Sequence, residues 1–274
     1  MEQNIITHSQ LFAQLRELGV APGDTLMLHV SVKAVGWIVG GPEVFLDALL
    51  DVLGSEGTLM MLAGWEDYPY HLSEWPPEQQ QAYREACPAF DPEHSRAHGK
   101  EFSRLCEYLR TRKKGGPVFR SAHPSCSVVA TGKQATWLCA DHPLQYGFGE
   151  RSPFAKLCEA GGWVLNIGAP LDTFTVLHYA EHRSQIANKR IARYQMPILV
   201  NGSRTWVDLE EFDSSNGIVD WDGEDYFELI AKDFIAARAI PECKVGEAIS
   251  YRFSASQLCD FGQQWMEAHF TGID

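Results

Sequence analysis

The chain of 274 residues has no run of about 18 apolar residues, so no membrane-spanning helix is predicted. Its N-terminus also lacks the basic flank and apolar stretch with which a secretory signal begins. Seven cysteines are present, but none forms a CxxC pair, and scattered thiols are typical of a reduced intracellular protein. We therefore expect a cytoplasmic protein with free cysteines, most of them buried.

Positive charge is scarce, because 23 Lys and Arg face 36 Asp and Glu and give a net charge of −13. This balance excludes nucleic acid as a partner, since a nucleic-acid surface needs a basic footprint. A cleft lined by carboxylates attracts small cations, although acidity alone also keeps a protein soluble. Neither of the common glycine-rich phosphate motifs, G-x-x-x-x-G-K-[ST] or G-x-G-x-x-G, occurs.

The chain does contain alternating apolar strands and amphipathic helices. Residues 25–30 and 58–63 predict buried strands, and a helix between them begins at Gly41-Pro42 and ends at Gly54. This order predicts an α/β fold with a layered sheet and flanking helices. With no linker or repeat visible, residues 1–274 are expected to form a single domain.

Further elements follow from caps and turns. A capping box at Thr7-x-x-Gln10 starts the first helix, Ser152-Pro153 starts another, and Asn201-Gly202 predicts a hairpin between 196–200 and 204–207. Residues 65–98 show no period and predict a long excursion beside the site. The other expected elements are helices near 100–111, 224–238 and 255–268 and strands near 125–130 and 163–167.

The densest chemistry is the segment His-Tyr-Ala-Glu-His at 178–182, on a helix expected to start near Asp172 or Thr173. As a bare pattern, H-x-x-E-H is the inverted zinc-peptidase signature, and its two imidazoles share a helix face. A third zinc ligand is then required, but no downstream acid has a spacing that singles it out. The alternative makes His182 an ordinary solvated helix residue.

Two other segments carry candidate anion-binding groups. The loop His29–Gly36 follows a strand and precedes a helix, where backbone N–H groups, Ser31 and Lys33 are suited to a pyrophosphate. The second segment is Arg120–Pro124. Its arginine is suited to grip a phosphate or carboxylate, and a plain surface turn explains it equally well.

Six stretches, in the same order and spread over roughly residues 5–270, resemble the aminoglycoside 3-N-acetyltransferase (antibiotic N-acetyltransferase) family, which is unrelated to the GNAT fold. They are Leu26–Gly36, Gly40-Gly-Pro42, Gly57–Asp67, Arg120–Pro124, Gly168–Asp172 and Leu177–Glu181. The resemblance implies transfer of an acetyl group from acetyl-CoA to the 3-amino group of a 2-deoxystreptamine antibiotic, which confers resistance.

The resemblance also implies roles for residues at matching positions. His178 corresponds to the proposed general base, with Glu181 as the carboxylate that follows it and Asp67 as a second choice to orient the ring. We expect Thr175, or N–H groups at the helix start, to stabilise the oxyanion. The CoA-binding positions are Ser31, Val32, Lys33, Ala34, Val35 and Gly36, with Arg120, Ser121 and His123. The acceptor positions are Asp67, Tyr68, Asp172, Glu211 and Asp213.

Two alternatives remain open at this point. One is a zinc-dependent hydrolase built on His178, Glu181 and His182, and the other is a non-catalytic binder of cationic ligands. The acetyltransferase hypothesis expects no metal and no membrane partner. The sequence gives no indication of the oligomeric state.

Overall fold

The computed structural model describes residues 4–67, 69–99 and 103–271. Its centre is a seven-stranded sheet in the order β10-β11-β7-β2-β4-β6-β5. Strand β2 runs parallel to β4 and β7, and the outer strands are antiparallel to their neighbours. The strands are β2 (Thr25–Val30), β4 (Thr58–Leu62), β5 (Val118–Arg120), β6 (Val128–Gly132), β7 (Trp163–Ile167), β10 (Cys243–Val245) and β11 (Ala248–Ser254).

Helices cover both faces of this sheet. Alternate residues of β2 enter two separate cores, with Leu26 and Leu28 on one face and Met27 on the other, as the two-residue period of a strand requires. The first core packs α1 (His8–Glu17), α3 (Pro42–Leu53) and α5 (Arg104–Arg110). The second packs α6 (Ala135–Cys139), α7 (Pro153–Glu159), α8 (Val176–Arg183), α9 (Tyr226–Arg238) and α10 (Ala255–His269).

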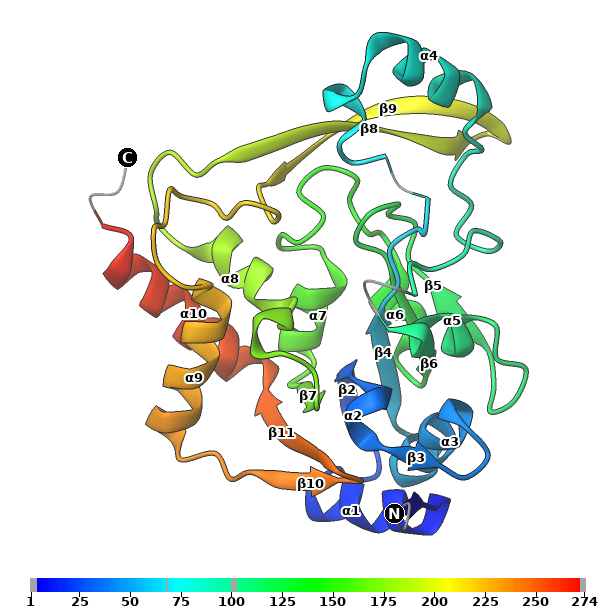
Figure 1. Cartoon of the computed structure of the whole chain (residues 1–274), viewed down its shortest axis with the longest axis vertical. Coiled ribbons are helices and arrows are strands. Elements are labelled where there is room, and N and C mark those ends of the chain that lie inside the picture. The colour runs from blue at the N-terminus through cyan, green and yellow to red at the C-terminus, as the bar shows by residue number, and fades with distance from the viewer. Residues whose placement is uncertain (1–3, 68, 100–102, 272–274) are drawn as a thin grey trace.

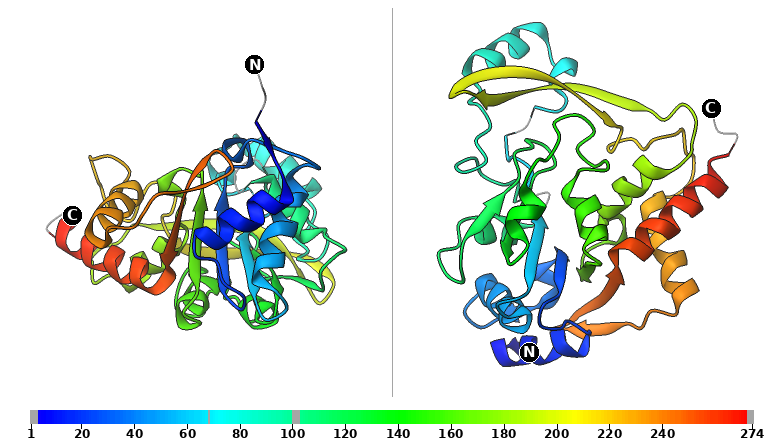
Figure 2. Two further views of the ribbon diagram at one scale, coloured as in Figure 1. Left: turned by 90° about the horizontal axis from the view of Figure 1, so that it is seen from below. Right: turned by 180° about the vertical axis from the view of Figure 1, so that it is seen from behind.

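A long hairpin crosses one end of the molecule, opposite the end that carries α1 (Figures 1 and 2). Strands β8 (Ile191–Val200) and β9 (Ser203–Phe212) pair along their whole length, so the hairpin is longer than predicted. Asn201 and Gly202 form its turn with φ values of 50° and 78°. Two central residues at positive φ are typical of the type I′ turn that the Asn-Gly signal predicts.

The excursion predicted at 65–98 contains secondary structure that its sequence did not indicate. It contains η1 (Leu72–Glu74) and α4 (Pro77–Ala86), and α4 lies over the hairpin in Figure 1. A small apolar cluster of Trp65, Cys87 and Phe90, with Ile198 and Trp206 of the hairpin against it, joins the two. Helix α4 has no buried residue, so its sequence carries little apolar period to detect.

Several short elements also lie beyond the predictions. Strand β1 (Ile5–Ile6) pairs with β3 (Trp37–Ile38), and β10 and β11 extend the sheet at one edge. The predicted strand near 125–130 begins three residues later, at Val128. Among the described residues, no helix combines the length and apolar character needed to cross a membrane.

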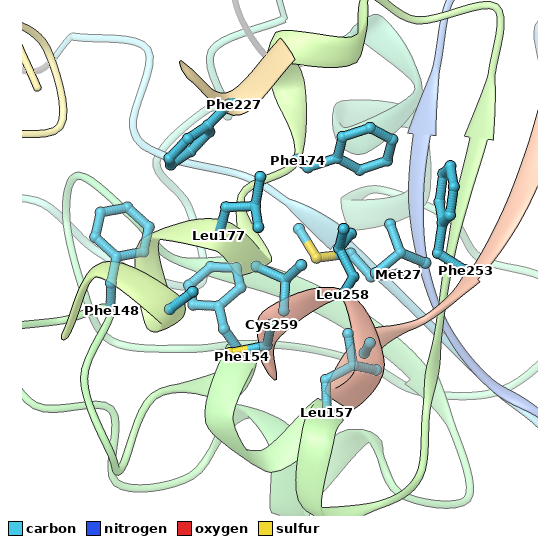
Figure 3. Packing of buried hydrophobic residues seen from close by; sticks show 14 of the residues in the cluster. Met27, Phe148, Phe154, Leu157, Phe174, Leu177, Phe227, Phe253, Leu258 and Cys259 are labelled. Carbon is cyan, nitrogen blue, oxygen red and sulfur yellow. The ribbon is translucent and has the colours of Figure 1, made fainter. Parts of the chain in front are cut away.

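The three parallel strands β2, β4 and β7 end at one edge of the sheet, where ligand sites of open α/β sheets occur. Gly168, just after β7, has φ 64°, and a Cβ there would lie 2.6 Å from the Cβ of Ala34. Only glycine therefore lets the turn after β7 approach α2 (Val32–Val35), the short helix that follows β2. The second core continues beneath this edge, where Phe174, Leu177 and Phe227 lie (Figure 3).

Candidate active site

A cavity of about 940 Å³ opens at this edge of the sheet. Its wall comes from the end of β2, from α2, from the start of α8 and from the hairpin, so segments far apart in sequence meet around it. Of the residues predicted from sequence, the cavity brings together Ser31, Val32, Lys33, Asp172, Thr175, His178 and Glu211.

His178 and Glu181 form a tight pair on the wall. The Nδ1 atom of His178 lies 2.6 Å from Oε2 of Glu181, because residues three apart on a helix share a face. The Tyr226 hydroxyl donates a short hydrogen bond to the other carboxylate oxygen. Glu181, rather than Asp67, is therefore the carboxylate that lies against the imidazole.

The two side chains of this pair differ in how far they are exposed. The side chain of Glu181 is 1% exposed, whereas that of His178 is 16% exposed and lines the cavity. The rings of Phe148 and Phe227 flank the imidazole at 4.5 and 4.8 Å between centroids. With Nδ1 engaged by Glu181, Nε2 is the nitrogen left for a bound molecule, since no described residue hydrogen-bonds to it.

The expectation that His182 is an ordinary solvated residue is wrong. Its side chain is only 10% exposed, and its Nε2 lies 2.6 Å from Oε1 of Glu211 on β9. Pairing of β8 with β9 places Glu211 opposite Ala192 near the base of the hairpin, close to α8. The two histidines of the motif thus pair with two different carboxylates.

The zinc interpretation receives no support from this arrangement. A tetrahedral site needs its ligands to converge on one point, whereas His178 and His182 are directed at Glu181 and Glu211 respectively. Within the described ranges, no group of three or more His, Cys, Asp or Glu side chains is placed to hold a metal ion.

The loop after β2 forms the short helix α2 rather than an open turn. Ser31 caps it by accepting a hydrogen bond from the Ala34 amide at 3.3 Å, and its own amide bonds to Ile167 of β7. Ser31, Val32 and Lys33 reach the cavity wall. The predicted contacts Ala34, Val35 and Gly36 do not, and Val35 is fully buried.

The segment at 120–124 lies behind the cavity wall. It is neither the surface turn nor the anion-binding segment that the sequence offered as alternatives. Arg120 donates to the carbonyl groups of Ser95, at 2.5 Å, and of Ala63, and to the Ser127 hydroxyl at 3.1 Å. Burial, then the charge of Arg110, lowers the pKa of Arg120 to about 10.

Ser121 and His123, in the same segment, are fully buried and do not line the cavity. The Ser121 hydroxyl accepts from the Val128 amide, and His123 accepts from the Cys126 amide. Burial lowers the pKa of His123 to about 4, so this imidazole is neutral at pH 7. The prediction that this segment contacts CoA finds no support in the geometry.

Only some of the predicted acceptor residues lie on the cavity wall. Asp172 is exposed on the cavity rim, and its pKa is raised by partial burial and then by the charges of Asp225 and Glu228. Asp213 does not line the cavity, and its carboxylate accepts from the Ser215 and Asn216 amides. Asp67 accepts from the Tyr83 hydroxyl at 2.8 Å, away from the wall. Tyr68 lies outside the described residues.

The helix with the motif begins later than predicted. Residues 171–173 form the 3-10 turn η2 (Leu171–Thr173), and α8 starts only after Thr175. The Thr173 hydroxyl donates back to the Pro170 carbonyl at 2.7 Å, so it does not cap the helix. Phe174 then enters the core, which leaves Thr175 on the cavity wall at the start of α8.

Sequence analysis missed several wall residues. Burial lowers the pKa of His29, at the end of β2, to about 4, and no described residue hydrogen-bonds to its Nε2. The sequence placed His29 at the start of the candidate pyrophosphate loop but gave its side chain no role. Other missed residues come from distant segments with no local signal, among them Tyr70, Arg104, Ser125, Cys126, Phe148, Tyr194, Ser214, Ser215 and Phe227.

Comparisons with known proteins agree over nearly the whole chain. A family model described as aminoglycoside 3-N-acetyltransferase matches residues 27–267. Aminoglycoside N(3)-acetyltransferase III of Pseudomonas aeruginosa is 45% identical over 264 residues, which cover 96% of this chain and 94% of that relative.

Solved structures show the same fold. AAC-IIIb in a binary complex with CoASH has a TM-score of 0.88 and 41% identity, with 97% of each chain covered. AAC-VIa bound to sisomicin has a TM-score of 0.89 and 39% identity, with 97% of this chain and 98% of that chain covered. These matches confirm the predicted layered α/β architecture.

Proposed function

Because the chain belongs to the aminoglycoside 3-N-acetyltransferase family, we propose that it transfers acetyl directly from acetyl-CoA to the 3-amino group of 2-deoxystreptamine antibiotics, with His178 as general base. The protein is an acyltransferase with acetyl-CoA as co-substrate, and its family confers antibiotic resistance. The single observation that carries the proposed mechanism is the His178–Glu181 pair on the wall of the cavity.

The chemical step joins an amine to a thioester carbonyl. An ammonium group is not a nucleophile, so the acceptor nitrogen has to give up a proton before or while its lone pair attacks the carbonyl carbon. Once the C–N bond forms, the positively charged nitrogen loses a second proton to solvent. The tetrahedral intermediate then collapses, the C–S bond breaks, and the CoA thiolate takes up the proton that the base removed from the ammonium. The products are the N-acetylated drug and CoA thiol.

His178 is suited to take that proton. Imidazole titrates near neutral pH, and Nε2 of His178 is the nitrogen left open to the cavity. Glu181 accepts from Nδ1 and thereby fixes the tautomer and the direction of the ring, and its negative charge stabilises the imidazolium that forms. Tyr226 in turn holds Glu181 through its hydroxyl.

The oxyanion requires hydrogen-bond donors that are already in place. Thr175 at the start of α8 is one candidate on the wall, where its hydroxyl has to turn from the Thr173 carbonyl, 3.4 Å away, to reach an oxyanion. His29 is a second, because its buried imidazole is neutral and its Nε2 has no partner among the described residues. The Phe174 ring, which precedes Thr175, lies 5.8 Å from the His29 ring, so both donors belong to one part of the cavity.

Acetyl-CoA carries phosphate groups that need cations. Among the described residues, Lys33 and Arg104 are the cationic side chains on the cavity wall. We assign them, with Ser31 and the first turn of α2, to the phosphates and pantetheine of CoA. Arg120 does not reach this wall, because it donates to the carbonyl of Ala63, the residue after the wall residue Leu62, and to the carbonyl of Ser95.

A thiol-release assay tests this proposal. Metal-free protein with acetyl-CoA, a thiol reagent and a panel of aminoglycosides should release CoA thiol only when the drug carries an amine at ring position 3. A zinc hydrolase would require added metal for activity. A non-catalytic binder would release no thiol with any drug, and either result would refute the proposal.

A further inference from the structure

The second histidine of the motif has no part in the chemistry described so far, yet it is nearly buried against a carboxylate. We propose that His182 is a positioning residue for acceptor specificity, because it holds Glu211 on the cavity wall as the binding group for a second ammonium of the drug. The inference rests on the proposed function, since the acceptor is taken to be a polycationic aminoglycoside.

Glu211 is fixed by three donors. His182 approaches Oε1 at 2.6 Å, the Phe212 amide donates to the same oxygen at 2.8 Å, and the Phe148 amide donates to Oε2 at 3.1 Å. The side chain is only 5% exposed, yet it contributes to the cavity wall. A carboxylate in such a place is stable only while its hydrogen bonds are kept.

This arrangement leaves room for a ligand. A carboxylate offers about four lone-pair positions, and the donors to Glu211 among the described residues occupy two on Oε1 but one on Oε2. Oε2 therefore keeps acceptor capacity at the wall. The ligand that complements a buried, negatively charged oxygen is an ammonium group.

His182 is itself held rigidly. Its ring lies 4.7 Å from the Phe212 ring and 5.9 Å from the Tyr146 ring. Lys189 donates to the carbonyl groups of Glu181 and His182 at 2.6 and 3.3 Å and lies over the Phe212 ring. An imidazole locked in this way fixes the carboxylate it touches.

The two histidines of α8 thereby serve two different amines of one substrate. His178 lies one turn before His182 on α8. The same helix therefore positions both the base and Glu211, the group that binds the second ammonium. Glu211 selects acceptors whose second ammonium lies at the right distance from the amine at the base. Binding energy from this remote group would orient the reacting amine.

Steady-state kinetics and calorimetric binding of gentamicin test the proposal. His182→Phe removes the hydrogen bond and should raise KM and Kd for gentamicin at least about tenfold, with kcat and the KM for acetyl-CoA changed less than about threefold. His182→Gln restores a donor and should recover part of the affinity. His8→Phe breaks a second histidine–carboxylate pair, with Asp51, away from the cavity, and is the matched control.

A double-mutant cycle gives the decisive result. Glu211→Gln should weaken gentamicin binding by itself, and in that background His182→Phe should add little, because both variants remove one interaction. Additive losses, or unchanged binding in Glu211→Gln, would overturn the proposal even if His182→Phe failed to fold. Calorimetry without acetyl-CoA needs no turnover, so failure here is distinct from failure of the acetyl-transfer proposal.

Discussion

At the scale of single residues, the cavity is organised by carboxylates whose surroundings differ. Glu181 is sealed in the core and receives hydrogen bonds from His178 and Tyr226. Asp172 stands exposed on the rim beside Asp225 and Glu228, whose charges raise its pKa after the effect of partial burial. The first environment suits proton transfer, and the second suits the attraction of a cation.

Replacement of His178 tests its proposed role as general base. His178→Ala should lower kcat at least about 100-fold, which is the low end for loss of a general base, and should leave the Kd for CoA nearly unchanged. Stopped-time thiol release and calorimetry measure the two quantities. Near-normal turnover of this variant would show that another group accepts the proton.

The rim carboxylate should act through charge rather than through chemistry. Asp172→Asn should raise KM for gentamicin by several-fold at low ionic strength and by less in about 0.5 M salt, because exposed charges are screened. Asp51→Asn, on the exposed end of α3 and paired with His8, is the control. An increase in KM that did not respond to salt would argue against an electrostatic role.

Sequence spacing placed His178 and Glu181 on one helix face and made Glu181 the first choice to orient the ring, and the structure decides between Glu181 and Asp67 in favour of Glu181. Spacing was insufficient for His182, whose partner Glu211 lies 29 residues away and is brought near by the pairing of β8 with β9. Spacing also left the role of Arg120 open, and the CoA contact came from the resemblance alone. A basic residue beside a turn looks available for phosphate, but here carbonyl groups from distant loops occupy its donors.

At the scale of elements, the position of α8 depends on its contact with α10. Gly262 of α10 is buried, and a Cβ there would lie 2.7 Å from Cδ2 of Leu177, the residue before His178. The same Cβ would lie 3.5 Å from Ala180. The absence of a side chain at this position thus lets the two helices approach closely.

A larger residue at this contact should displace His178, the proposed base. Gly262→Val should destabilise the fold by about 1–3 kcal/mol, as overpacking does, and should also lower kcat because Leu177 has to move. Thermal denaturation and kinetics report the two effects. Gln257, on the same helix, is exposed, so Gln257→Val should change neither stability nor kcat. Normal kcat in Gly262→Val would show that activity does not depend on the exact position of α8.

Elements were predictable where local chemistry decides them. The capping box at Thr7, the Ser152 cap and the Asn201-Gly202 turn all form as predicted. The start of α8 was not predictable in this way. The Thr173 hydroxyl donates back to the Pro170 carbonyl, and Phe174 is buried before the helix begins. The residue at which α8 begins depends on the core that Phe174 enters, and residues near it in sequence do not reveal that core.

At the scale of the whole molecule, an acidic chain contains buried imidazoles that resist protonation. Burial lowers the pKa of His123 to about 4 and that of His142 well below its ordinary value. The unfolded chain takes up these protons near pH 6.5, whereas the folded chain does not. The stability that these groups contribute is therefore present above pH 6.5 and is lost as the pH falls toward 4.

Urea denaturation between pH 7.5 and 4.5 should show this loss. The difference between pKa 6.5 and about 4 at His123 corresponds to about 3 kcal/mol, and His123→Gln should flatten the decline. The exposed His94 provides a contrast, because Asp91 raises its pKa and its contribution is lost as the pH rises. A decline of the same steepness in His123→Gln and the parent would contradict this assignment.

The central claim is that acetyl passes from acetyl-CoA to one defined amine of the drug in a single cavity. Nuclear magnetic resonance of the product from acetyl-CoA and gentamicin tests it most directly, with CoA thiol measured in the same sample. The account predicts a single acetyl group on the 3-amino nitrogen of the 2-deoxystreptamine ring and an equal amount of thiol. Acetylation at a different amine, or thiol release without acetylated drug, would contradict it.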